Sequence, residues 1–97
     1  MFSGSAIATF REAEGLTLIL PRAHAEEHGL ACEFPCRLIT LGAYTCLDAI
    51  GILAKVTAAL AEAGIAVNAV SAFHHDHLFV PLERAERALS VVRELSL

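Results

Sequence analysis

The feature that most constrains the fold is an amphipathic stretch near the middle of the chain. Within residues 50–63, Ile52, Val56 and Leu60 recur at helical spacing among small alanines. Gly64 follows directly and is typical of a helix C-terminus. The pattern predicts a helix that packs its apolar side on a sheet, between the strands that precede and follow it.

Other apolar runs predict the elements around this helix. Strands are expected over residues 6–11, 16–20, 37–44, 65–73 and 78–82, and helices over residues 21–28 and 83–95. From residue 37 the order is β-α-β-β-α, which favours one sheet with both helices on one face.

The expected fold class is α+β, with a ferredoxin-like βαββα core. Such a core needs a fourth strand, and we predict that residues 16–20 supply it by pairing in the sheet of residues 37–44 and 65–73. The N-terminal strands would thus complete an antiparallel sheet. The expected organisation is a single domain over residues 1–97, made of an N-terminal strand and helix segment (1–30) and a core (37–97).

Composition excludes some classes of function. The chain has 97 residues, a net charge of −4 and scattered basic residues, so it lacks the basic patch typical of nucleic-acid binding. No apolar run reaches the ~18–20 residues of a membrane span. The chain is 56% hydrophobic, which predicts apolar surface outside the monomer core and therefore a homodimer.

The cysteines and the N-terminus indicate a compartment. Cys32, Cys36 and Cys46 cannot all pair within one chain, and residues 1–5 do not resemble a signal peptide. These features predict reduced thiols in the cytoplasm.

Four ionisable residues, His74-His75-Asp76-His77, separate two apolar strands. Placing them at a hairpin tip is costly unless the tip has a role. Strand alternation allows His75 and His77 to share one side, so a metal site there would need ligands from elsewhere or from a dimer mate. We therefore expect no metal or other cofactor, and keep a His75–His77 metal site as an alternative.

Catalytic patterns are weak. Ser71 and Thr45 have no evident general base, so we expect no enzyme activity. Residues 24–28 fit the H-x-x-E-H pattern of some metalloproteases. The helix between Pro21 and Gly29 is barely two turns long, so a solvated helix face is the expected role.

Several segments resemble a known family. Residues 48–54 (Asp-Ala-Ile-Gly-Ile-Leu-Ala) and 64–68 (Gly-Ile-Ala-Val-Asn), with the helix between them, are similar to the ACT-domain superfamily. Residues 11–21, 39–41 and 75–81 (His-Asp-His-Leu-Phe-Val-Pro) resemble a small bacterial ACT-like branch. Relatives in that branch usually carry an additional N-terminal segment that builds a first ACT-like half.

The resemblance implies a regulatory domain that binds an amino acid or similar metabolite, usually at an interface between two ACT units. It implies that a strand–helix glycine loop faces an aspartate and an aromatic residue on a neighbouring strand. The ligand-binding residues implied in this way are Asp48, Ala49, Ile50, Gly51, Ile52, Asn68, Phe73 and Asp76.

Elementary chemistry favours the same kind of ligand. The helix N-terminus after Gly51 suits a carboxylate, and Asp76 or Asp48 can accept a hydrogen bond from an ammonium group. Two alternatives remain: a structural or protein-interaction module without a ligand, and a metal-binding protein using residues 74–77.

Overall fold

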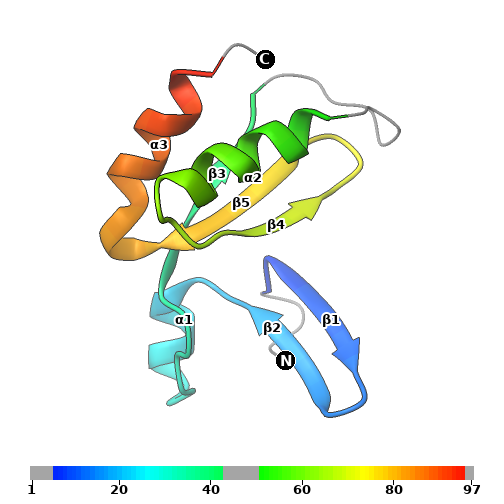
Figure 1. Ribbon diagram of the computed structural model, residues 1–97. Coiled ribbons are helices and arrows are strands. Elements are labelled where there is room, and N and C mark those ends of the chain that lie inside the picture. The colour runs from blue at the N-terminus through cyan, green and yellow to red at the C-terminus, as the bar shows by residue number, and fades with distance from the viewer. Residues whose placement is uncertain (1–5, 43–50, 96–97) are drawn as a thin grey trace. The chain divides into compact units, whose positions relative to one another are not determined.

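The computed structural model describes residues 6–42 and 51–95. The chain forms two compact units, residues 1–33 and 34–97, here called the N-terminal unit and the C-terminal unit. Their boundary falls between the expected segment 1–30 and the expected core 37–97. The elements of both units are shown in Figure 1.

The N-terminal unit is a β-hairpin followed by a short helix. Strands β1 (Ala8–Glu12) and β2 (Gly15–Ile19) pair antiparallel through all five positions. Helix α1 (Arg22–Glu27) follows, with Pro21 as its N-cap rather than its first residue. Proline suits this position because its φ is already fixed. It also lacks an N–H group, and a residue at the start of a helix has no acceptor within the helix for that group.

The predicted pairing of residues 16–20 with the core sheet is wrong. In the described structure, β1 and β2 form their own two-stranded sheet, and the core sheet has three strands. Only Ala13 and Glu14 separate the two strands, so each meets its sequence neighbour first. Strand propensity locates such segments but does not say which partner they take.

The C-terminal unit confirms the α+β class and the β-α-β-β-α order. Its elements are β3 (Cys36–Thr40), α2 (Ile52–Glu62), β4 (Asn68–Ser71), β5 (Asp76–Pro81), a 3₁₀ turn (Leu82–Arg84) and α3 (Ala85–Arg93). The sheet order is β3-β5-β4, and both pairings are antiparallel. Strand β5 is therefore the central strand, although it comes last in the sequence.

The core lies between this sheet and the two helices. Leu78 and Val80 of β5 are fully buried. They belong to one apolar cluster with Val56 and Leu60 of α2 and Val91 of α3. Both helices thus cover the same face of the sheet (Figure 1). Val56 and Leu60 are the members of the predicted stripe that are completely buried.

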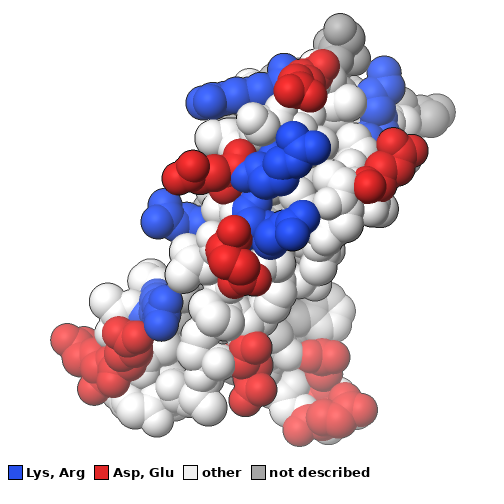
Figure 2. Space-filling model, turned by 60° about the vertical axis from the view of Figure 1, so that its left-hand side comes forward, with Lys and Arg blue, Asp and Glu red and all other residues white. Residues whose placement is uncertain are grey.

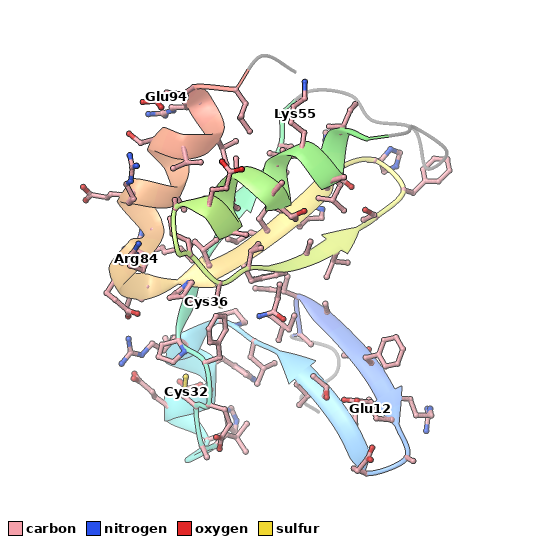
Figure 3. The ribbon with its side chains drawn as sticks, viewed as in Figure 1. Glu12, Cys32, Cys36, Lys55, Arg84 and Glu94 are labelled. Carbon is pink, nitrogen blue, oxygen red and sulfur yellow. The ribbon has the colours of Figure 1, made fainter. Side chains whose placement is uncertain are left out.

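One side chain anchors the end of α2. The guanidinium Nη2 of Arg84 donates a hydrogen bond of 3.0 Å to the carbonyl oxygen of Ala63, the C-cap of α2. Carbonyls at a helix C-terminus lack intrahelical partners, and a cation is favourable there. Arg84 lies where β5 gives way to α3 (Figure 3).

A core truncation tests this packing. We expect Leu78→Ala to lower the free energy of unfolding by about 2–5 kcal/mol, because it removes a fully buried side chain from the sheet–helix cluster. Leu82→Ala is the matched control: Leu82 is 37% exposed, and its replacement should cost under about 1 kcal/mol. Urea unfolding followed by circular dichroism measures both; equal losses would contradict the described core.

Candidate ligand-binding site

Asp76 is a charged residue buried in the C-terminal unit, with only 6% of its surface exposed. It begins β5 opposite Ser71, and its backbone carbonyl accepts a hydrogen bond of 3.0 Å from the N–H of Leu41. Strand alternation places its side chain on the same face as Leu78, towards the helices. Burying a carboxylate is costly unless donors or a cation face it.

The N-terminus of α2 lies at this end of the sheet. In Figure 1 the first turn of α2 and the turn that joins β4 to β5 are at the same end of the sheet, and the hydrogen bond from Arg84 to Ala63 places the other end of α2 near the end of β5. Gly51 is the N-cap of α2 and adopts a left-handed conformation, with φ 89° and ψ −14°. The first N–H groups of a helix have no intrahelical acceptors, and the helix dipole makes this end favourable for negative charge. Gly51 has no side chain that could accept from them.

An exposed aromatic ring occupies the β4–β5 turn. Phe73 is 71% exposed, and its ring meets that of His74 edge to face, with centroids 4.9 Å apart. The turn is closed by a hydrogen bond of 3.0 Å from the N–H of Ala72 to the carbonyl of His75. The turn therefore presents apolar surface next to the end of the sheet that carries Asp76.

The other face of this sheet end carries a small polar group in which Thr40 joins the two histidines that the sequence already indicated, His75 and His77. Thr40 Oγ1 and His77 Nδ1 form a hydrogen bond of 2.9 Å across the β3–β5 pair. The rings of His75 and His77 lie 6.3 Å apart, on one side as alternation allows. The Nδ1 atom of His75 is buried without a hydrogen-bond partner among the described residues. Only the strand register, which the sequence does not state, places Thr40 opposite His77.

The predicted ligand residues divide into three groups. Gly51 and Ile52 are at the start of α2, Phe73 is in the β4–β5 turn and Asp76 begins β5, so all four are at the same end of the sheet. Asn68 begins β4 opposite Phe79, three positions and therefore roughly 10 Å from the Ser71–Asp76 pair. Its position in the register places its side chain on the face away from the helices. The third group, Asp48, Ala49 and Ile50, lies outside the described residues.

The alternative metal site at His75 and His77 offers two imidazoles. Among the described residues, three possible ligand atoms of His, Cys, Asp or Glu side chains come together in the N-terminal unit, at His24, Glu27 and His28. The hairpin pair would thus still need ligands from elsewhere.

Charged side chains are distributed differently over the two units. On the C-terminal unit in Figure 2, basic and acidic side chains are interspersed, whereas acidic side chains predominate on the N-terminal unit. Exposed residues of both signs follow one another on the 3₁₀ turn and α3, from Glu83 and Arg84 to Glu86 and Arg87. Lys55 is on the outer side of α2, away from the sheet (Figure 3). None of the described helices is long and apolar enough to cross a membrane.

Comparisons with known proteins give a consistent result. Residues 32–94 match a family model described as an ACT domain, and residues 2–37 match a second model with the same description. A crystal structure of a Vibrio cholerae protein of unknown function, described as a possible transport protein, is 42% identical with a TM-score of 0.89. The match covers 98% of this chain and 72% of that one. No curated protein matches the chain.

The backbone at the start of α2 can be tested by substitution. We expect Gly51→Ala to cost about 1 kcal/mol of stability, because its φ of 89° disfavours a residue with a Cβ although the surrounding space is open. Gly42→Ala, also in open space but without a positive φ, should change stability by under about 0.5 kcal/mol. Thermal unfolding compares the two; equal effects would contradict the left-handed N-cap.

Proposed function

The chain belongs to the ACT-domain family, and we propose that its C-terminal unit is a non-catalytic regulatory module that binds an amino acid or a similar small metabolite. ACT domains are generally regulatory domains that bind small ligands. The family match at residues 32–94 contains every described element of the C-terminal unit.

The observation that carries the proposal is the burial of Asp76 at the end of the sheet where α2 begins. A carboxylate that is 6% exposed supplies a negative group on the helix side. The α2 N-terminus supplies N–H donors and a partial positive charge nearby. An amino acid needs hydrogen-bond donors for its carboxylate and a negatively charged acceptor for its ammonium group. This end of the C-terminal unit offers both kinds of partner.

Roles follow from this chemistry. The ligand carboxylate would accept hydrogen bonds from the first N–H groups of α2, which Gly51 lets it approach closely. The ligand ammonium would donate to Asp76 in a charge-assisted hydrogen bond. Ile52, which is half-buried, and Phe73 would contact the apolar part of the ligand.

The other predicted ligand residues are Asp48, Ala49, Ile50 and Asn68. By resemblance, Asp48, Ala49 and Ile50 would complete the glycine loop. The proposal assigns no direct contact to Asn68, because its side chain lies on the other face of the sheet. A structural hydrogen-bonding role suits its exposed position at the start of β4.

We further propose that the module works as a cytoplasmic homodimer. ACT domains commonly dimerise. Large apolar side chains are exposed on this chain, among them Phe10, Leu16 and Phe73. Exposed apolar groups of this size favour an interface. They also favour the second candidate function, a protein-interaction module that binds another chain and no small ligand.

A ligand screen tests the proposal. We expect one free amino acid to raise the melting temperature on the order of ten degrees at a hundred times its Kd, since such saturation adds ~2.7 kcal/mol. Asp76→Asn should abolish the shift, because it removes the charge that binds the ammonium while keeping the side-chain shape. Phe73→Ala should weaken the shift with little effect on the unliganded protein, because Phe73 is largely exposed.

The matched control is Glu62→Gln, which removes an exposed carboxylate from the last turn of α2, far from its N-terminus. It should keep the full ligand shift. If no amino acid or related acid raises the melting temperature, the proposal fails and the interaction module is favoured. A shift that survives in Asp76→Asn would place the ligand elsewhere.

A further inference from the structure

We propose that α1 of the N-terminal unit carries a zinc site formed by His24, Glu27 and His28, separate from the proposed amino-acid site. Each of these residues offers one ligand atom, and the three atoms lie within 4.8 Å of one another. Ligands about 2 Å from a tetrahedral ion lie roughly 3.3 Å apart, so the three side chains are close enough for rotation about their side-chain bonds to bring them onto one ion.

The helix geometry explains why the three side chains converge. Residues i, i+3 and i+4 of a helix lie on the same face, and His24, Glu27 and His28 have this spacing. His28 is the C-cap, and its N–H donates a hydrogen bond of 3.3 Å to the carbonyl oxygen of His24, which keeps the i, i+4 spacing at the end of α1. The two imidazole rings lie beside each other, with centroids 4.6 Å apart and planes inclined by 45°.

A backbone contact orients one of the proposed ligands. His28 Nδ1 lies 3.1 Å from the carbonyl oxygen of His24, where an Nδ1–H donates to that oxygen. In this tautomer Nε2, rather than Nδ1, carries the lone pair through which an imidazole binds a metal. Histidine ligands in metal sites usually have such a partner on the other ring nitrogen, which raises ligand basicity and holds the ring.

The surrounding charge favours a cation. The N-terminal unit contains five glutamates against two arginines, a formal net charge of −3. Arg22, the arginine on α1 itself, forms a salt bridge with Glu26, with Nε and Oε2 3.1 Å apart. That pair includes Glu26 rather than Glu27, so the guanidinium of Arg22 is bound to a carboxylate outside the proposed donor set.

The donor set selects the metal. Two imidazoles and one carboxylate suit Zn²⁺, which takes three protein ligands of this kind and leaves a fourth position for water. Glu27 and His28 are exposed and His24 is half-buried, so the ion would exchange with solvent. A bound ion would also join two residues one turn apart and stabilise this six-residue helix. Helix α1 is too short to line a protease cleft, but a metal site needs only the one face of the helix that carries the three ligands.

Calorimetric titration of the untagged full chain with zinc chloride at neutral pH tests the site. We expect one Zn²⁺ per chain. The double variant His24→Ala/His28→Ala should weaken binding by about tenfold or more, and Glu27→Gln should weaken it less. Alanine and glutamine both favour helix, so circular dichroism should show both variants folded before zinc is added.

The matched control is His74→Ala/His77→Ala, which removes the same number of imidazoles from the β4–β5 hairpin and should keep wild-type affinity. In NMR spectra, zinc should shift the imidazole signals of His24 and His28 before those of the other histidines. Absence of binding in the wild type would overturn the proposal. So would unchanged affinity in the α1 double variant, or loss of binding only in the hairpin control.

Discussion

The central position of β5 is the constraint on which the C-terminal unit depends. This strand is hydrogen-bonded on both sides, to β3 and to β4, and it carries the fully buried Leu78 and Val80. Because successive side chains alternate, burying these two residues against the helices also turns Asp76 towards the helix side. The packing of the core and the direction of the proposed ligand carboxylate are therefore consequences of the same register.

The helices were the most predictable part of the fold. The apolar stripe between residues 50 and 63 indicated a helix, and α2 occupies Ile52–Glu62. This succeeded because helix periodicity and glycine stops are local properties of the chain. Sheet pairing depends on distant partners, and it was the part that failed. Residues 16–20 do form a strand, but they pair with their neighbour across a two-residue turn instead of completing the core sheet.

The candidate site also has residues that local sequence patterns indicate and residues whose positions depend on strand pairing. Gly51 and Asp76 could be identified from a glycine before a helix and an acid between apolar strands, helped by family resemblance. Strand register determines that Thr40 pairs with His77 and on which face of the sheet Asn68 lies, so only the structure shows both. The pattern at residues 24–28 was visible in the sequence, but only the directions of the side chains show that three ligand atoms converge.

A ligand site at the Asp76 end of β5 can be located residue by residue by following amide chemical shifts while an amino acid is added to the full chain. We expect the largest changes at Gly51 and Ile52 and from Ser71 to Asp76, while Asn68 and the C-terminal end of α2 near Ala63 change little. Changes centred on the face of the sheet opposite the helices, or confined to the N-terminal unit, would contradict a ligand site at the Asp76 end of β5.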